Sequence, residues 1–272
     1  SVCMPTYMGA NFIGAAIESV LMQTFSDFEL IVIDDNSTDE TELIVANYND
    51  SRIRFLRNDR NLGPEGNWNR CLSEARGRYI KLLPQDDILS LNCLESQVAV
   101  LEADTDESIA LVFCARTIID PLGRNIMTRG YPRHQGGRIS SRSAIRSSIR
   151  SGTNLIGEPG GVLFRMSLAD KVGGFDASIG YIVDLDYWFR LLVHGDAYYL
   201  AEKLVSFRVS FGSWSFVIGN NQCTDFSRLI DRVAANPACD IDKTIFITGK
   251  VMARVNNLLR LLLYKFLQMR DK

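Results

Sequence analysis

The sequence predicts an α/β fold with a mostly parallel sheet flanked by helices. Two observations support this prediction. Short apolar runs alternate with helix-length segments over residues 28–115, and turn-forming or acidic residues follow most of these runs directly. Strands that alternate with helices of this size are joined by right-handed crossovers into a mostly parallel sheet. Such sheets bind ligands at the carboxyl ends of their strands.

The elements are predicted in the following order. Residues 28–33 form an apolar, β-branched strand that stops at Asp34-Asp35-Asn36-Ser37, a turn followed by a helix start. Residues 52–56 alternate between polar and apolar, as a strand with one wet face does. Two further strands are predicted at 79–83, stopped by Pro84, and at 110–114. Helices are predicted near residues 11–23, 40–48, 67–75 and 91–101.

The composition is that of a globular protein. The chain has 272 residues, 46% of them hydrophobic, which is enough for one large α/β domain or one domain with an appendage. A formal net charge of −2 gives no basic field for nucleic acid, so we expect no nucleic-acid partner. The six cysteines form no C-x-x-C pair, and only two histidines accompany them. We therefore expect neither a zinc site nor a disulfide framework, and a reducing, cytosolic setting.

The same sequence predicts no membrane-spanning segment. Its start, Ser1-Val2-Cys3-Met4-Pro5, has no basic region and no long apolar stretch, so no signal peptide is expected. The first residue is not Met, which indicates that residues lie upstream or were removed. No segment reaches the roughly 18 to 20 uninterrupted apolar residues of a spanning helix. We expect a cytoplasmic protein, at most peripheral at the inner face of the membrane.

Two later segments leave alternatives open. Residues 121–150 carry seven arginines, which is typical either of a loop that meets phosphates over a site or of a solvated connection with one surface helix. Residues 250–270 repeat apolar side chains at helical spacing among basic ones. Such a helix can lie on an anionic membrane or bind a partner. We favour a terminal helix packed on its own domain.

Several motifs occur together and in a set order. They are Val2-Cys3-Met4-Pro5-Thr6-Tyr7, the run from Leu21 through Asp34-Asp35-Asn36-Ser37-Thr38-Asp39, Asn61-Leu62-Gly63 with Asn69, Gln85-Asp86-Asp87, Gly173-Gly174-Phe175-Asp176, and Asp184 through Arg190. In this order and spacing they strongly resemble family 2 inverting glycosyltransferases, over residues 1 to about 210. The resemblance implies a GT-A fold, in which a nucleotide-binding α/β sheet is joined to an acceptor-binding half.

The resemblance assigns the donor site to the first motifs. Pro5, Thr6 and Tyr7 are expected to line the nucleobase and ribose pocket, and Asp35 to hydrogen-bond the base. A short acceptor side chain at a strand end can read an N–H of uracil or thymine. The alternative for Asp35 is a structural role in the turn before the next helix.

The resemblance also assigns the cation and the base. Asp87 matches the carboxylate that binds Mg²⁺ or Mn²⁺, and Asp86 the one that touches the ribose; a structural turn is the alternative. Hard cations prefer carboxylate and phosphate oxygens and neutralise a departing diphosphate. Asp184 resembles the general base that takes the proton of the acceptor hydroxyl. Asp186 is kept as its substitute, and a helix-start role is the alternative for Asp184.

The chain departs from the family pattern at several positions. Gln85 stands at the first carboxylate position of the D-x-D region, Val183 where Glu often precedes the base, and Ser210 where a His often follows Arg208-Val209. Trp68 stands where relatives often carry Arg before Asn69. We expect Arg208 to contact phosphate or to be structural. Trp188 and Trp214 are expected in the core, with stacking on a sugar as the alternative.

The function that these features favour is inverting transfer of a single sugar. The donor is expected to be a UDP- or dTDP-type nucleotide sugar, and the acceptor a glycan, lipid-linked or protein hydroxyl in cell-surface polysaccharide or glycoconjugate assembly. The alternative is a non-catalytic sugar-nucleotide or glycan-binding relative. A dinucleotide-binding enzyme is disfavoured because the glycine-rich fingerprint is absent. The expected division is a transferase domain at 1–215, with a nucleotide-sugar half at 1–115 and an acceptor half at 116–215, followed by a helical extension at 216–272.

Overall fold

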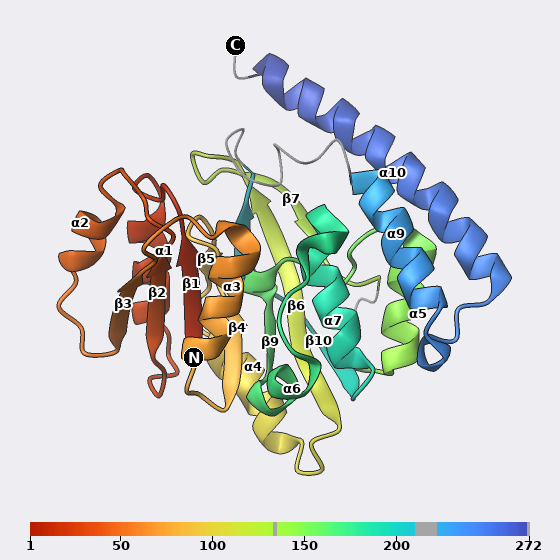
Figure 1. Cartoon of the computed structure of the whole chain (residues 1–272), viewed down its shortest axis with the longest axis horizontal. Helices are drawn as coiled ribbons and strands as arrows, with labels where there is room; N and C mark the ends of the chain where they lie inside the picture. Colours follow the sequence, from red (N-terminus) through yellow and green to blue (C-terminus); the bar gives the residue numbers. More distant parts are fainter. Residues whose placement is uncertain (133–134, 210–221, 271–272) are drawn as a thin grey trace.

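The computed structural model describes residues 1–132, 135–209 and 222–270. In this part of the chain, one ten-stranded sheet runs through the molecule in the order β3-β2-β1-β4-β9-β6-β10-β5, with β7 beside β6 and β8 beside β10 (Figure 1). The predicted α/β fold is confirmed.

The first half of the sheet is parallel, as the alternation predicts. Its strands are β1 (Val2–Thr6), β2 (Leu30–Asp34), β3 (Ile53–Arg57) and β4 (Tyr79–Leu82). Its helices are α1 (Ile13–Leu21), α2 (Thr41–Ala46) and α3 (Gly63–Glu74). Thr6 is in register with Asp34, and Asp34 with Arg57. The carboxyl ends of these strands therefore lie at one level, where polar side chains converge.

The second half mixes directions. Antiparallel β9 (Val162–Arg165) lies between β4 and β6 (Ile109–Ile119), and β10 (Asp196–Arg208) runs parallel to β6. The short strands β5 (Ile88–Leu89), β7 (Asn125–Arg129) and β8 (Gly137–Ile139) pair antiparallel. Its helices are α4 (Cys93–Ala103), α5 (Ser141–Ser151), α6 (Met166–Val172), α7 (Val183–Leu192), α9 (Gln222–Ala234) and α10 (Lys243–Arg270). The alternation of apolar runs with helix-length segments, which predicts the first half, is weak here. Among these strands the sequence predicted only β6.

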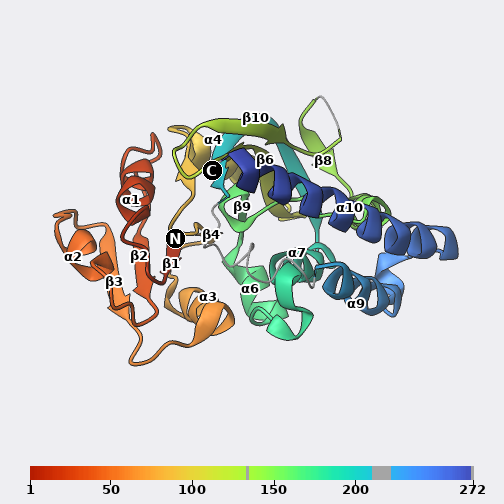
Figure 2. The same ribbon diagram turned by 90° about the horizontal axis from the view of Figure 1, so that it is seen from above.

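Helices cover both faces of the sheet (Figure 2). One apolar cluster joins α3, α5, α6 and α7 to one face, and two further clusters join α1 and α4 to the other. Trp188 and Tyr187 of α7 are fully buried in the first cluster. The core position expected for Trp188 is confirmed, whereas Trp214 lies outside the described residues. Cys3 and Cys114 are buried, free thiols, as their apolar surroundings predict.

Polar contacts fasten the two halves together. Lys81 of β4 is fully buried, and its Nζ donates to the carbonyl oxygens of Gly160 (2.6 Å) and Val162 (3.3 Å). Gln97 of α4 donates to the carbonyl of Gly161 (2.8 Å). Because these bonds satisfy a buried ammonium and a buried amide, they fix the segment that enters β9 against the end of β4.

The basic segment 121–150 folds into β7, β8 and α5. Arg138 pairs with Asp196, and Arg146 pairs with Asp240 and Asp242. These partners favour the interpretation as a surface connection, although Arg129 lines the pocket described below.

The C-terminal helix α10 packs on its own fold, against α5 and α9. Its buried face is narrow and includes Ile245, Gly249 and Ala253. Among its described side chains, seven large apolar ones are exposed: Ile247, Val251, Val255, Leu258, Leu259, Leu261 and Leu262. Among the described residues, no helix is both long enough and apolar enough to cross a bilayer.

Candidate active site

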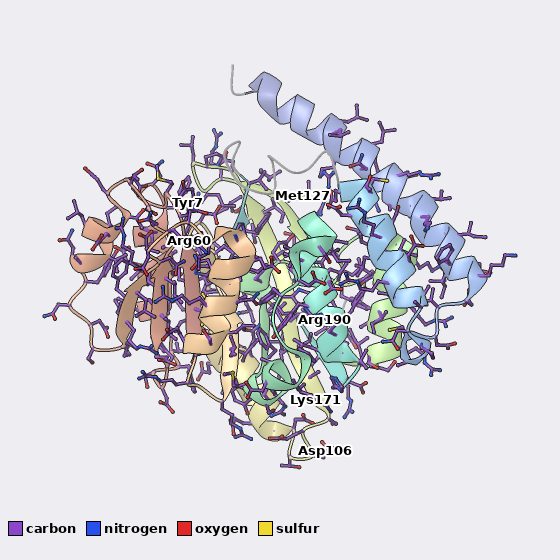
Figure 3. All side chains as sticks on the ribbon, in the orientation of Figure 1. Tyr7, Arg60, Asp106, Met127, Lys171 and Arg190 are labelled. Carbon is purple, nitrogen blue, oxygen red and sulfur yellow. The ribbon has the colours of Figure 1, made fainter. Side chains whose placement is uncertain are left out.

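A pocket of about 620 Å³ opens at the carboxyl edge of the parallel strands. Tyr7 after β1 and Met127 of β7 both line it, and Figure 3 shows them at the same upper edge of the molecule. Lys171 and Asp106 mark the opposite edge. The pocket therefore lies where an open α/β sheet is expected to bind its ligand.

One end of the pocket is built around the end of β1. Thr6 is buried, whereas the side chain of Tyr7 is half exposed and faces the opening. The side chain of Gln85 accepts from Thr6 Oγ1 and from the backbone N–H of Tyr7 (2.8 Å), and donates to the Tyr7 carbonyl (2.9 Å). Gln85 therefore joins the ends of β1 and β4. The sequence left its role open, and the structure gives it this structural one.

Asp35 lies beside this end and is almost fully buried. Its Oδ1 accepts from Asn58 Nδ2 (2.6 Å) and the N–H of Leu62 (2.8 Å), and its Oδ2 from the N–H of Gly63 (2.9 Å). These bonds hold the start of α3 and explain the carboxylate by turn and helix-start chemistry. Asp35 also lines the pocket, so contact with a nucleobase remains an expectation.

Asp86 and Asp87 are adjacent but have different surroundings. Asp86 lines the pocket, and burial raises its pKa. Asp87 is fully buried and is not among the pocket-lining residues. Its Oδ1 accepts from the N–H of Arg208 (3.0 Å), and its Oδ2 has no hydrogen-bond donor among the described residues. Burial and the charge of Asp86 raise the pKa of Asp87 well above its usual range.

This geometry bears on the expected cation ligand. A Cβ built on Gly160 would lie 3.2 Å from Asp87 Oδ2, so this oxygen faces the segment entering β9. The pocket instead receives the carboxylate of Asp86. Arg208 has a structural role, because its side chain donates to the carbonyl oxygens of Asp86, Asp120 and Pro121, each at 3.0 Å; it also lines the pocket, so a phosphate contact stays an expectation.

The described residues contain no group of three or more His, Cys, Asp or Glu arranged to hold a metal ion. A magnesium-type cation needs fewer, because one or two carboxylates and the substrate phosphates suffice. Asp86 fits this requirement as a pocket-facing carboxylate. Ser210, which replaces the family histidine, lies outside the described residues.

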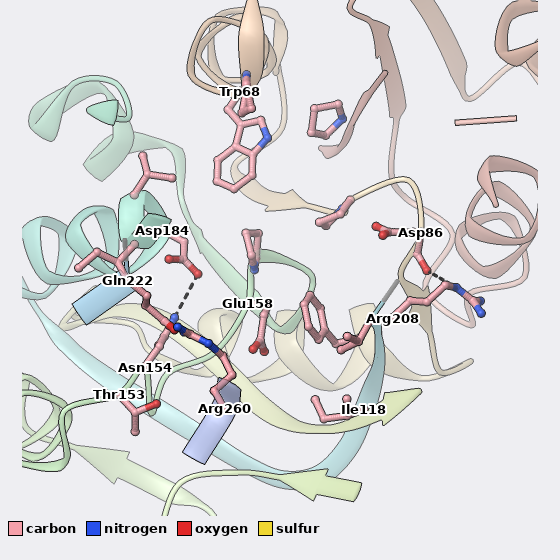
Figure 4. A pocket seen from close by; sticks show the side chains of 18 of the residues that line it. Trp68, Asp86, Ile118, Thr153, Asn154, Glu158, Asp184, Arg208, Gln222 and Arg260 are labelled. Carbon is pink, nitrogen blue, oxygen red and sulfur yellow. Dashed lines mark hydrogen bonds between the residues drawn. The ribbon is translucent and has the colours of Figure 1, made fainter. Parts of the chain in front are cut away.

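Asp184 lies in the first turn of α7 and lines the middle of the pocket. Asn154 donates from Nδ2 to Asp184 Oδ2 (3.1 Å), as the dashed line in Figure 4 shows. The N–H of Leu185 donates to the other oxygen (2.7 Å). Asn154 is itself held by bonds to both backbone groups of Gly157, whose carbonyl also accepts from Trp188 Nε1 (3.1 Å). The carboxylate orientation is therefore fixed from a neighbouring loop.

The charges around Asp184 tune its proton affinity. Burial, together with the nearby charge of Glu158, raises its pKa to about 7, while the hydrogen bond from the N–H of Leu185 and the charge of Arg116 act in the opposite direction. Glu158 lines the pocket and forms an ion pair with the buried Arg116 of β6. A carboxylate with a pKa near neutrality suits a general base, because it is both available and sufficiently basic.

Asp186, the alternative to Asp184, has another role. It is buried and does not line the pocket. Its oxygens bind Arg190 Nε (2.9 Å) and Arg232 (3.1 Å). The pair with Arg232 fastens α7 to α9, and the pair with Arg190 lies within α7. The structure therefore brings Asp184 to the pocket and leaves Asp186 in the scaffold.

Sequence reasoning missed several pocket residues. Asn154 and Glu158 come from the loop after α5, and Asn257 and Arg260 come from α10; Arg116 of β6 does not line the pocket but pairs with Glu158. None belongs to a local motif, because strand pairing and helix docking bring them together. For Asn257 and Arg260 the sequence signal was their place as polar residues inside an otherwise apolar helical pattern; the loop residues Asn154 and Glu158 had none.

Comparisons with known proteins agree with this geometry. The family model described as "Glycosyl transferase family 2" matches residues 1–173. An uncharacterized glycosyltransferase of Rickettsia typhi is 31% identical over 212 residues, covering 77% of this chain and 63% of that protein. The Escherichia coli UDP-Glc:alpha-D-GlcNAc-diphosphoundecaprenol beta-1,3-glucosyltransferase WfgD is 43% identical over 101 residues, covering 37% of this chain and 40% of that protein. The chain thus spans less than two thirds of these relatives.

The fold has solved counterparts. Residues 1–349 of S. aureus TarS, in complex with UDP-GlcNAc, superpose with a TM-score of 0.67 at 19% identity, covering 86% of this chain and 65% of that one. At this identity the likeness establishes the GT-A-type fold.

Proposed function

Because the chain belongs to glycosyl transferase family 2, we propose that it transfers a single sugar from a nucleoside diphosphate sugar to a hydroxyl acceptor, with inversion. The observation that carries this proposal is the place of Asp184. Its carboxylate lines the same pocket as Thr6 and Tyr7 of the donor-type end and as the side chains of α10. A base at that position can reach an acceptor hydroxyl that faces the donor sugar.

Single-displacement inversion asks for one free carboxylate. Asp184 accepts the proton of the acceptor hydroxyl as its oxygen attacks the anomeric carbon, and the diphosphate departs. Glu158, the second carboxylate nearby, is engaged with Arg116. Asn154 and the N–H of Leu185 hold Asp184 in one orientation, so little reorganisation is needed when the substrates bind.

For the donor we propose a UDP- or dTDP-type nucleotide sugar bound against Pro5, Thr6, Tyr7 and Asp35. We propose Mg²⁺ or Mn²⁺ as the cofactor, held by Asp86. Asp87, the ligand expected from the resemblance, instead accepts a hydrogen bond from the N–H of Arg208 and so stabilises the segment that carries Asp86. A bound cation supplies charge neutralisation for the diphosphate leaving group.

For the acceptor we propose a lipid-linked sugar in cell-surface polysaccharide assembly. WfgD, by its name, acts on a diphosphoundecaprenol-linked sugar. The exposed apolar side chains of α10 and its basic residues support a peripheral contact with the cytoplasmic face of a membrane. The pocket draws on all three parts of the proposed division, 1–115, 116–215 and 216–272.

Calorimetric titration tests the donor site. UDP, dTDP, GDP and NAD are titrated with and without Mn²⁺ into the wild type, Asp86→Ala and Asp87→Ala. We expect Mn²⁺-dependent binding of UDP or dTDP that Asp86→Ala abolishes. No binding of any nucleoside diphosphate would refute the proposal. Sugar transfer is then screened with lipid-linked acceptors, and Asp184→Asn serves as the blank. Nucleotide binding without transfer above this blank would identify the non-catalytic alternative.

A further inference from the structure

The two ends of the pocket differ in charge. The donor-type end holds the carboxylates of Asp35 and Asp86. The far end, formed by α10, contains Arg260 with Asn256 and Asn257, and Arg129 of β7 also lines the pocket. The acidic residues in the rest of the lining are Asp184 and Glu158, and Glu158 is paired with Arg116. This far end therefore favours a ligand that carries negative charge and hydrogen-bonding groups.

Helix α10 is held at this end of the pocket by hydrogen bonds to the end of α5 and by close backbone packing. Asn256 donates from Nδ2 to the carbonyl oxygens of Ser151 (2.7 Å) and Gly152 (3.1 Å), where α5 ends. A Cβ on Gly152 would lie 2.3 Å from the backbone nitrogen of Ala253, and one on Gly249 would lie 2.6 Å from the Ile149 carbonyl oxygen. The backbones of α5 and α10 are therefore in direct contact, and this contact fixes α10 beside the pocket.

Arg260 follows Asn256 by four residues and so lies on the same face of the helix. Figure 4 shows its side chain extending from α10 into the pocket on the side of Asn154. Its guanidinium donates to Asn257 Oδ1 (2.5 Å), and both residues line the pocket. An oriented guanidinium is the preferred protein group for a phosphate, because its fork offers parallel donors.

The opposite face of α10 is suited to contact with a lipid surface. Seven large apolar side chains are exposed on this helix between Ile247 and Leu262. Residues 243–270 contain six Lys or Arg and no Asp or Glu. A single helix thus presents a guanidinium to the pocket and an apolar, basic face to the outside, which suits a ligand with a phosphate head and a hydrocarbon tail.

We infer that Arg260, with Arg129, forms a subsite for the diphosphate of a lipid-linked acceptor, separate from the diphosphate site of the donor. The inference rests on the proposed function and adds the acceptor's phosphate to it. The family model ends at residue 173, so α10 lies beyond the part of the chain that it describes.

The test measures binding of a phosphate probe while the donor site is filled. The full chain is saturated with UDP and Mn²⁺ and titrated with a short-chain prenyl diphosphate, and separately with the matching prenyl alcohol. We expect the diphosphate to bind and Arg260→Ala to weaken it about tenfold or more, as for loss of a charge-assisted pair. The affinity for the alcohol should stay the same. Arg254→Ala is the matched control, since Arg254 is exposed on the same helix and does not line the pocket.

Each other outcome decides against the subsite. Equal diphosphate affinity in the wild type and Arg260→Ala would overturn it, as would a parallel loss for the alcohol or a weakened affinity for UDP. If Arg260→Ala does not fold, Arg129→Ala and Arg260→Lys are measured instead, and both should weaken the diphosphate alone. If UDP fails to bind the wild type, the proposed function fails, and the titration without UDP still decides whether Arg260 binds a diphosphate.

Discussion

Asn154 donates a hydrogen bond to Asp184 across thirty residues of sequence, from the loop after α5 to the first turn of α7. The same amide bridges both backbone groups of Gly157. The side chain therefore acts as a brace: it has one contact with the carboxylate and two with a loop that Trp188 also holds.

Replacing this brace should slow the reaction without weakening the donor. For Asn154→Ala we expect kcat to fall about ten- to hundredfold, because a misplaced base loses its alignment with the acceptor hydroxyl. Losing a donor to the ionised form also raises the pKa of Asp184, so the acidic limb of the kcat profile moves to higher pH. Steady-state kinetics across pH measures both effects. Asn125→Ala, an exposed asparagine outside the pocket, is the control; an unshifted limb with normal kcat would contradict the role of Asn154.

The pH dependence should report on Asp184 itself. Its pKa of about 7 means that the ionised base is lost as pH falls through 7, so kcat/KM declines toward acid with unit slope. Glu158→Gln removes a negative charge that raises this pKa and leaves Arg116, which lowers it. We expect the limb to move down by about one pH unit. A limb that stays in place, in a variant with normal melting temperature, would show that Glu158 does not act on the base.

Substitutions of Asp86 and of Asp87 should have different effects on cation binding and on stability. Both pKa values are raised by burial, but only Asp86 faces the pocket. For Asp87 the folded pKa lies above the unfolded value, so its contribution to stability is fully present below the unfolded pKa and is lost as pH rises through the folded one. Asp87→Asn should remove this loss of stability at high pH, because the amide carries no charge. We therefore expect its free energy of unfolding near pH 8 to be about 1 kcal/mol or more above that of the wild type. Denaturant unfolding at several pH values measures it.

In the same comparison, Asp86→Asn should change the free energy of unfolding in the same direction but by less, because the pKa of Asp86 is raised less than that of Asp87, and it should abolish the Mn²⁺ dependence of UDP binding. The reverse pattern, with Asp87→Asn losing the cation and Asp86→Asn having the larger effect on stability, would restore Asp87 as the ligand.

The packing of α10 should depend on Gly249. Valine there would meet the Ile149 carbonyl oxygen, a backbone atom that no side-chain rotation can relieve. We expect Gly249→Val to cost about 1–3 kcal/mol, more than any gain in helix propensity, and to speed amide exchange along α10. UDP affinity should be kept, because the donor-type end contains no residue of α10. Thr244→Ala, exposed on the same helix, is the control; unchanged exchange would refute the tight contact.

Much of the first half could be predicted from sequence. The run that became β2 is apolar throughout and ends in acidic turn residues, which is the local signature of a buried parallel strand. The family motifs also favoured Asp184, which lines the pocket, over Asp186, which does not. What could not be predicted is non-local. Asn154 has no motif, and its role arises only when the loop after α5 meets α7.

Charge alone was a poor guide in the second half. The arginines of residues 121–150 could be assigned to a ligand or to solvent, and the structure pairs Arg138 and Arg146 with aspartates from distant segments. The resemblance assigned the cation to Asp87 and the ribose to Asp86, whereas in the structure Asp86 lines the pocket and Asp87 is fully buried; a single residue of register decides which one faces the pocket.

The buried bonds of Lys81 have a consequence for engineering. They tie the strand that leads to Asp86 directly to the segment that carries Glu158, inside one uninterrupted sheet. No hinge separates the donor-type and acceptor-type halves there, so ligand-driven movement is left to side chains and to elements at the pocket's rim. A chimera that combines the donor half of one relative with the acceptor half of another must therefore take Lys81 and the Gly160–Val162 segment from the same parent, or else leave an ammonium without its carbonyl partners in the core.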